Sequence, residues 1–515
     1  MKLKKIIVIY LIVFAVSLLA QETAKPPFAL LWKYSTTFLQ GSIVQPLMDG
    51  DTLYFSAGNE VSAIDVNTGE TKWKFTLPTG TTVRVTPLLH KDSIIVPASD
   101  GKLYIINKQG HQERLLDFGA GGAVTATPIW VEDMLVFPCL DNTLYAINPD
   151  AEDPKDIVKW RFRAGDNIPR SPVYGKGLIF FESADIYLYA LTPNGEVRWK
   201  VPLPSTIISS APILGQKYVY ATAGRSIQFV NPLSGKVVRQ VDLPDVITAT
   251  PLLVGNIIYA GCKDGKLYAI DATTGGRVKN FTPYDAGVSI TTSPALYGDY
   301  IYFGTANGLL VAIDKSGKLR WQYRMISQAT PVYPSPFMPA TAAAQLTSQQ
   351  FAIYATPFWA NGYLFALSDD GTLHCFTPQN VDVAPPIVSD IWPEGGPMSG
   401  LPVPLKISAK ITDEGSGVDS MSIVVKVDGK IISGGTIGGK VVSLYKFDPN
   451  TGTLECNYNP GGAPGTPIPA GEHTVTVQVA DWFGNVAQKE WKFTIDNTLP
   501  PGAGRGTTPT IYYFR

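Results

Sequence analysis

The chain has 515 residues, a net charge of −1 and only 17 % charged residues, which excludes the basic stripe typical of nucleic-acid binding. Its 48 glycines, 41 prolines and 11 % aromatic residues suit a turn-rich β protein better than a helical one. The length is too great for one ordinary domain, although all-β repeat domains commonly exceed the usual size.

Residues 1–20 have the pattern of a secretory signal. Three lysines among the first five residues precede an unbroken apolar run over residues 6–20. A bilayer span needs about 20 apolar residues, so a signal cleaved after Ala20 is favoured over an uncleaved anchor. No Cys follows the run, so lipid attachment at a new N-terminal Cys is not expected. We expect an exported protein of the periplasm, cell surface or extracellular space, with no membrane span after cleavage.

A repeated phrase organises residues 28–378. It reads Lys-Asp-Gly-Lys-Leu-Tyr-Ala-Ile-Asp at residues 263–271, and variants occur at 99–107, 140–148, 306–314 and 369–377. Asp-Gly accepts the positive φ angles of a two-residue hairpin, and the alternating residues after it predict a strand. A hairpin that returns at a nearly constant interval indicates a repeat architecture.

A proline after a small or polar residue marks the start of each unit. The eight markers are Pro46, Pro87, Pro128, Pro172, Pro212, Pro251, Pro294 and Pro357, at intervals of 41, 41, 44, 40, 39, 43 and 63 residues. A period of 40–45 residues with about four strands per unit is the spacing of a β-propeller.

The eighth unit lacks the Trp-bearing strand that ends several others, and such a strand precedes the first unit instead. Residues 31–34 (Leu-Trp-Lys-Tyr) match residues 72–75 (Lys-Trp-Lys-Phe). We therefore predict an eight-bladed propeller in which the N-terminal strand completes the last blade. Closure of this kind removes the open strand edges that promote aggregation.

The long interval before the eighth marker contains residues 325–350, which include four prolines and an Ala-rich stretch. Long insertions without regular structure are usually functional or disordered. We predict a flap over the mouth of the propeller channel, with a surface loop of no function as the alternative.

The periodic pattern stops near residue 385, after a Pro-containing linker over residues 379–386. Short alternating strands over residues 387–496 predict a β-sandwich. The Pro/Gly-rich residues 497–515 are expected to form a disordered tail.

Three carboxylates crowd one turn of the predicted sandwich: Asp413, Glu414 and Asp419. Gly415 and Gly417 would allow a tight loop around a hard cation, so this turn is a candidate Ca²⁺ site. A solvated acidic turn is the alternative and the commoner outcome.

These motifs carry two resemblances. The Asp-Gly-x-Leu-Tyr-Ala-Ile-Asp units with their Trp strands resemble the pyrroloquinoline-quinone-like (quinoprotein-like) repeat family over about residues 28–378. That family includes quinoprotein alcohol dehydrogenases and the propeller lipoprotein of the outer-membrane β-barrel assembly machine. Residues 471–485 are similar to the late strands of bacterial immunoglobulin-like modules, which implies that the sandwich is of that type.

The resemblance does not bring the enzymes' chemistry with it. Quinoprotein enzymes are marked by adjacent cysteines, a Ca²⁺ ion held by Glu and Asn, and a catalytic Asp. The four cysteines here, at positions 139, 262, 375 and 456, are far apart and are expected to be buried apolar side chains rather than disulfides. Glu182 and Asp185 are the nearest acidic candidates, and ordinary loop polarity explains them better. We expect no quinone cofactor.

The resemblance to the lipoprotein implies a non-catalytic scaffold of the cell envelope that binds partners through its loops. We expect the protein to be monomeric and to bind a protein or a cell-surface polymer through the channel face. The alternatives are a quinone- or Ca²⁺-dependent oxidoreductase and a carbohydrate- or cell-surface-binding protein. Loops that enter the inner strands converge on one mouth of the channel, and polar residues on a rigid ring suit recognition. The candidate binding residues in these loops are Arg84, Asp166, Asn167, Arg170, Asp245 and Asp285.

Overall fold

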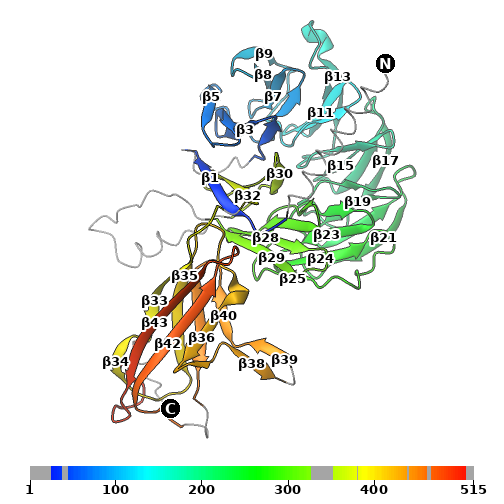
Figure 1. Cartoon of the computed structure of the whole chain (residues 1–515). Coiled ribbons are helices and arrows are strands. Elements are labelled where there is room, and N and C mark those ends of the chain that lie inside the picture. Colours follow the sequence, from blue (N-terminus) through cyan, green and yellow to red (C-terminus); the bar gives the residue numbers. More distant parts are fainter. Residues whose placement is uncertain are drawn as a thin grey trace, which may run out of the picture.

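The computed structural model describes residues 25–36, 44–325, 352–379, 381–437, 440–460 and 466–505. Within these ranges the regular structure is strand, apart from two short 3₁₀ turns, η1 (Pro154–Asp156) and η2 (Ser420–Ser422). Figure 1 shows a ring of sheets from residues 29–377 and a smaller body from residues 387–495. No helix in the described ranges is long and apolar enough to cross a membrane. The predicted all-β class is confirmed.

The ring contains eight sheets of four antiparallel strands among the described residues. The first strands of several neighbouring sheets contact each other, for example β10 with β14 and β14 with β18, so first strands lie at the centre of the ring. We call them inner strands, and the fourth strands outer strands.

Seven of these sheets take their strands in chain order. The strands are β2 (Leu47–Asp49), β3 (Thr52–Ala57), β4 (Glu60–Asp65) and β5 (Thr71–Thr76); β6 (Leu88–His90), β7 (Ser93–Pro97), β8 (Leu103–Asn107) and β9 (Gln112–Leu116); β10 (Ile129–Val131), β11 (Met134–Cys139), β12 (Thr143–Ile147) and β13 (Val158–Arg163); β14 (Val173–Gly175), β15 (Leu178–Ser183), β16 (Tyr187–Leu191) and β17 (Val197–Pro202); β18 (Ile213–Leu214), β19 (Val219–Ala223), β20 (Ser226–Val230) and β21 (Val237–Asp242); β22 (Leu252–Val254), β23 (Ile257–Gly261), β24 (Lys266–Asp271) and β25 (Tyr284–Asp285); β26 (Ala295–Tyr297), β27 (Tyr300–Gly304), β28 (Leu309–Asp314) and β29 (Leu319–Arg324).

The N-terminal strand completes the eighth sheet, as predicted. This sheet contains β30 (Phe358–Ala360), β31 (Tyr363–Leu367), β32 (Thr372–Thr377) and, as its outer strand, β1 (Ala29–Ser35). Trp32 of β1 pairs with Cys375 of β32. Strands from the two ends of the repeat region therefore close the ring at one seam. The predicted flap, residues 325–350, lies outside the described residues apart from Met325.

The Asp of the repeated phrase holds its own hairpin. The Asp264 carboxylate accepts the backbone N–H of Lys266 at 3.0 Å and the hydroxyl of Tyr268 at 2.6 Å. Gly265 has a φ of 83°, as the turn requires. The Tyr-to-Asp bond recurs in three other sheets, as Tyr104–Asp100, Tyr145–Asp141 and Tyr189–Asp185.

A second recurring contact ties each sheet to the next. The indole N–H of Trp73 in β5 donates at 2.7 Å to the carbonyl of Lys108, in the turn between the third and outer strands of the following sheet. A Cβ at Gly110 of that turn would lie 2.7 Å from the indole ring, so only glycine fits there. Equivalent bonds join Trp32 to Val66, Trp160 to Pro193 and Trp199 to Pro232.

Other donors replace the tryptophan in the three sheets that lack it. Arg114 donates to the carbonyl of Pro149 at 2.9 Å, and Arg239 donates to that of Thr273 at 3.4 Å. In the sixth sheet the backbone N–H of Thr282 donates to the carbonyl of Ser316 at 3.0 Å. The sequence repeat is thus degenerate, whereas the contact between sheets persists.

The seventh sheet has no such turn to bind, because the outer strand of the eighth sheet comes from the N-terminus. Its Trp321 donates instead to the carbonyl of Ser416 at 3.1 Å, in the loop 413–417 of the smaller body. The Tyr323 hydroxyl donates to the carbonyl of Glu414 at 3.0 Å, and the N–H of Leu30 in β1 donates to that of Gly415 at 3.0 Å. The loop 413–417 therefore takes the place of the missing turn.

The smaller body consists of two sheets packed around one apolar core, with a separate hairpin. The β35 strand alternates between core and surface residues, as expected for a strand with one face on a core. One sheet has the order β33-β35-β41-β40 and the other β34-β43-β42-β36-β37. The strands are β33 (Ile387–Trp392), β34 (Gly395–Met398), β35 (Leu405–Thr412), β36 (Val424–Val427), β37 (Lys430–Ile431), β38 (Gly434–Ile437), β39 (Lys440–Ser443), β40 (Tyr445–Asp448), β41 (Thr453–Tyr458), β42 (Gly471–Ala480) and β43 (Val486–Ile495).

The prediction of a disordered tail is wrong for residues 497–505. The Arg505 guanidinium donates to the carbonyl of Ser399 at 2.9 Å, and the N–H of Gly502 donates to that of Leu401 at 2.8 Å. The Pro/Gly composition produces tight turns that bring these donors to free carbonyls, so it does not prevent order here. Residues 506–515 lie outside the described ranges.

Replacement of Trp321 by Phe tests the contact at the seam. The substitution leaves the buried carbonyl of Ser416 without its donor, which should lower the free energy of unfolding by about 1–3 kcal/mol. The Trp199→Phe variant is a matched control, because it removes the same bond between two sheets of the ring. We expect both variants to lose stability and only Trp321→Phe to speed proteolytic cleavage near residues 379–386. Equal cleavage in the two variants would show that the Trp321 bond does not hold the loop 413–417 against the ring.

Candidate functional site

The residues just before the marker prolines line the centre of the ring. One pocket, of about 200 Å³, is lined by residues that include Arg84 and Arg170. A second, of about 520 Å³, shares Arg170 and includes Tyr354. The lining residues come from all eight sheets, so the two pockets are adjoining parts of one central channel. One lining residue from each sheet is Gln45, Thr86, Thr127, Ser171, Ser209, Thr250, Ser293 and Thr356.

Hydroxyl groups in the channel wall form two sets with different roles. The first set joins neighbouring sheets: Thr125 donates to the carbonyl of Ile168 at 3.0 Å, and three other hydroxyls make the equivalent bond. These are Ser209 to Ile247, Thr248 to Ile290 and Thr291 to Ile353.

The second set lies two residues further along, directly before the marker prolines. In this set Thr250 accepts the N–H of Ala211 at 2.9 Å. The other five hydroxyls have no hydrogen bond to any residue that the structure describes: Thr86, Thr127, Ser171, Ser293 and Thr356. They are therefore available as donors to a molecule in the channel.

Arg84 and Arg170 are the two charged side chains among the residues that line these pockets. Nε of Arg84 makes one long bond, of 3.5 Å, to the hydroxyl of Thr82. The guanidinium of Arg170 has no hydrogen bond within the described ranges. Burial lowers the pKa of Arg170 and nearby Glu182 opposes that shift, but a guanidinium remains protonated in proteins. The channel therefore presents positive charge.

Glu182 lies near Arg170 but is not among the described residues that line the two pockets. Its side chain is fully buried in β15, where one carboxyl oxygen accepts the N–H of Thr222 at 3.1 Å and the other has no partner. Burial raises the pKa of Glu182 well above its usual range, and the N–H of Thr222 and the charge of Arg170 oppose that shift.

The channel brings together two of the six predicted binding residues, Arg84 and Arg170. Asp166 accepts the N–H of Asn167 at 2.7 Å, and Asp245 accepts that of Val246 at 2.7 Å, so both carboxylates serve their own loops. Asp285 lies on the outer strand β25, 3.6 Å from the Lys266 ammonium. None of these four residues is among those that line the two pockets.

Sequence reasoning missed the hydroxyl residues of the wall. Their signal is nevertheless visible, because a Ser or Thr stands before six of the eight marker prolines and recurs with the period of the repeat.

The channel wall does not fit the quinone site of the enzymes. No Cys, Asp or Glu is among the described residues that line either pocket. Cys139 in β11, Cys262 directly after β23 and Cys375 in β32 are buried, unpaired and belong to three different repeat units. Asp185 is held in the hairpin of its own sheet by Tyr189, at 2.5 Å.

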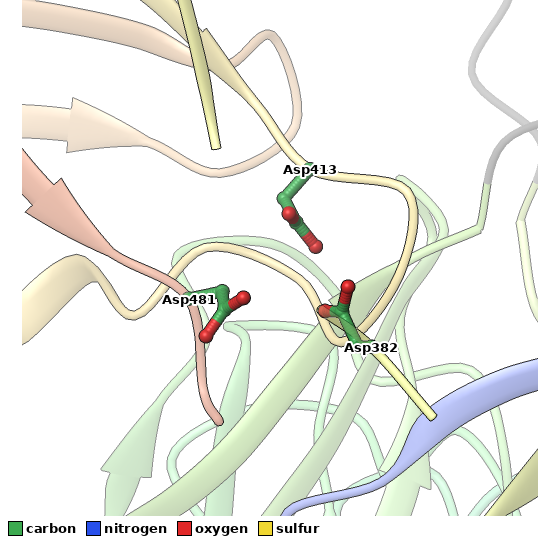
Figure 2. Close-up of side chains that lie close together, drawn as sticks. All are labelled: Asp382, Asp413 and Asp481. Atoms are coloured by element: carbon green, nitrogen blue, oxygen red, sulfur yellow. The ribbon is translucent and has the colours of Figure 1, made fainter. Parts of the chain in front are cut away.

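A second cluster lies where the smaller body meets the ring. Figure 2 shows the carboxylates of Asp382, Asp413 and Asp481 pointing toward one another. Each offers one oxygen, and these oxygens lie within 4.8 Å of one another. Asp382 and Asp481 are buried, with 7 % and 2 % exposure, and no Lys or Arg in the described ranges forms an ion pair with any of the three.

The cluster holds the loop at the seam. Asp413 accepts the N–H groups of Gly415 and Gly417 at 3.1 and 2.7 Å, and Asp382 accepts that of Ser416 at 2.7 Å. Burial raises the pKa of Asp413 to about 6; the Asp382 and Asp481 charges add to the shift, whereas the Gly417 N–H opposes it. Three oxygens so arranged could hold a hard divalent cation.

The predicted Ca²⁺ residues are only partly brought together. Asp413 belongs to the cluster, with Asp382 and Asp481 in place of Glu414 and Asp419. Asp419 caps η2 by accepting the N–H of Met421 at 3.0 Å. The calcium hypothesis stays a prediction, with a changed set of residues.

The Asp413→Asn variant tests this prediction. Because the folded state holds the Asp413 proton more tightly than the unfolded chain, the stability it contributes is full below about pH 4 and is lost as the pH rises through about 6. In EDTA, the Asp413→Asn variant should not show this loss of stability as the pH rises. At pH 7.5, about 1 mM Ca²⁺ should raise the Tm of the natural protein but not of Asp413→Asn.

Glu414→Gln and Asp419→Asn are the matched controls, since each removes one carboxylate outside the cluster. Both should keep the Ca²⁺ response. If neither Ca²⁺ nor EDTA changes the Tm of the natural protein at pH 7.5, the cation site is refuted.

Comparisons with known proteins address the ring. A family model described as outer membrane protein assembly factor BamB matches residues 29–157, 141–282 and 281–378. A search of curated proteins finds no match. The crystal structure of BamB from Moraxella catarrhalis is similar, with a TM-score of 0.52 and 14 % identity over 68 % of this chain and 99 % of that chain.

The computationally designed Ika8 protein is similar to the same degree, with a TM-score of 0.54 and 15 % identity over 68 % of this chain and 99 % of that chain. At these identities the structural likeness shows the fold alone, a β-propeller of four-stranded antiparallel sheets. The family model covers most of the chain and confirms the predicted resemblance to quinoprotein-like repeats. Because this model matches residues 29–378, the chain belongs to the family described as outer membrane protein assembly factor BamB.

Proposed function

We propose that this protein is a non-catalytic, exported scaffold of the cell envelope that binds a partner protein at the rim of its channel. The observation that carries the proposal is the channel wall, where two arginines that form no ion pair with a described carboxylate lie among hydroxyls that bond to no described residue, on a closed ring. Polar groups on a rigid frame are suited to recognition. The family's name, an outer membrane protein assembly factor, supports an envelope location and a protein partner.

The proposal also covers the number of blades and the type of the smaller body. The eight sheets would be the blades of an eight-bladed propeller, and residues 387–496 an immunoglobulin-like module. The bonds from Trp321 and Tyr323 to the loop 413–417 support a fixed placement of this module on the ring. A fixed module would orient the channel relative to whatever the module contacts.

Photo-crosslinking tests the proposed binding surface. A photoreactive residue placed at Ser171 or Thr356, on the channel wall, should give a discrete adduct with one envelope protein. The same residue at Val197, which is 49 % exposed on the outer strand β17, should not. We expect the Arg84→Ala/Arg170→Ala double variant to weaken the adduct by at least about tenfold, because hydrogen bonds to charged groups contribute about 1.5–3 kcal/mol each.

Arg163→Ala/Arg198→Ala is the matched control, since it removes two exposed arginines from the outer strands β13 and β17. It should leave the adduct unchanged. Adducts that form only at Val197, or that ignore the channel arginines, would show that the channel rim is not the binding surface. Dye-linked turnover with pyrroloquinoline quinone and Ca²⁺ would favour the oxidoreductase alternative.

A further inference from the structure

The two adjoining channel pockets are large enough for a small ligand. Their volumes of about 200 and 520 Å³ meet at Arg170, and ligand sites in proteins typically measure about 300–1,000 Å³. The lining is mostly polar and lies on a ring closed by strand pairing, so the wall is formed in advance.

The wall is rich in hydrogen-bond donors. The sheet-joining hydroxyls, such as Thr125, give their protons to backbone carbonyls. By contrast, five hydroxyls beside the marker prolines have free protons, and the guanidinium of Arg170 has five N–H groups with no acceptor in the described part of the chain. A molecule that satisfies this wall must bring acceptors.

The charge of the wall selects among such molecules. A neutral polyol would satisfy the hydroxyls but would leave Arg84 and Arg170 uncompensated. Carboxylate and phosphate groups accept two parallel bonds from one guanidinium, and these charge-assisted bonds are roughly twice as strong as neutral ones. No carboxylate among the described lining residues competes for the guanidinium of Arg170, and burial favours the neutral form of the nearby Glu182 carboxyl.

We propose that the channel binds a compact oxyanion, a carboxylate or phosphate group, between Arg170 and the hydroxyls beside the marker prolines. The inference deepens the proposed function, because it uses the same face of the ring and specifies the chemistry that a ligand or a partner's side chain must present there. Carboxylate and phosphate share this chemistry, and two probes separate them.

Isothermal titration of the full mature chain provides the test, with inorganic phosphate and citrate as anionic probes and trehalose as a neutral one, all at constant ionic strength. We expect saturable binding of at least one anion and none of trehalose. Arg170→Gln should weaken that binding about ten- to a hundredfold, the range set by one hydrogen-bonded charge. Preference for citrate or phosphate then identifies the group.

Two variants keep the result interpretable. Arg198→Gln removes an exposed charge from β17 and should leave the affinity unchanged, whereas Arg170→Lys keeps the charge but loses the fork and should give an intermediate affinity. Absence of saturable binding by both anions would overturn the proposal, as would equal losses in Arg170→Gln and Arg198→Gln. If rim adducts form but neither anion binds, the scaffold function stands and the oxyanion site is refuted. If an anion binds but no adducts form, the oxyanion site stands and the scaffold function is refuted.

Discussion

The pairing of β1 with β32 is the contact on which the rest of the structure depends. It joins Ser35 to Thr372 across the whole repeat region and turns an open row of sheets into a ring. A closed ring leaves no strand edge at the seam, and it fixes the inner strands around one channel. The hydroxyl and arginine residues of the channel wall converge only because the ring is closed.

Closure in this manner has a structural cost that the smaller body offsets. In each other sheet a turn connects the third strand to the outer strand, and the preceding sheet donates a hydrogen bond to it. The eighth sheet lacks that turn, so Trp321 would be left with a buried, unbonded N–H. The loop 413–417 supplies the carbonyl of Ser416, and the carboxylates of Asp382 and Asp413 hold the loop in shape. The smaller body is therefore part of the closure.

Local patterns of the sequence predicted much of the ring. Asp-Gly turns, alternation and the marker prolines gave the hairpins and the period, and the Trp of residues 31–34 gave the closing strand, because these signals are encoded within one unit. The partner of Trp321 could not be predicted, since it lies in the smaller body, 95 residues along the chain. Arg114 and Arg239 replace tryptophan through a different side chain, so no residue pattern marked them.

The candidate sites divide in the same way. Arg84 and Arg170 could be placed at the channel because they lie in the loops before inner strands. Asp285 was predicted in such a loop, but it lies on β25, the two-residue outer strand of its sheet. The grouping of Asp382, Asp413 and Asp481 depends on how the linker docks against two distant loops. Proximity of Glu414 and Asp419 in sequence was a poor guide, because successive residues of a turn point in different directions.

Hydrogen–deuterium exchange of residues 28–36 in the full chain tests the closed ring most directly. Closure by β1 predicts that its amides exchange as slowly as those of β17, an outer strand joined to its sheet by an ordinary turn. Exchange of β1 at the rate of an unstructured peptide, with β17 protected, would contradict closure at this seam.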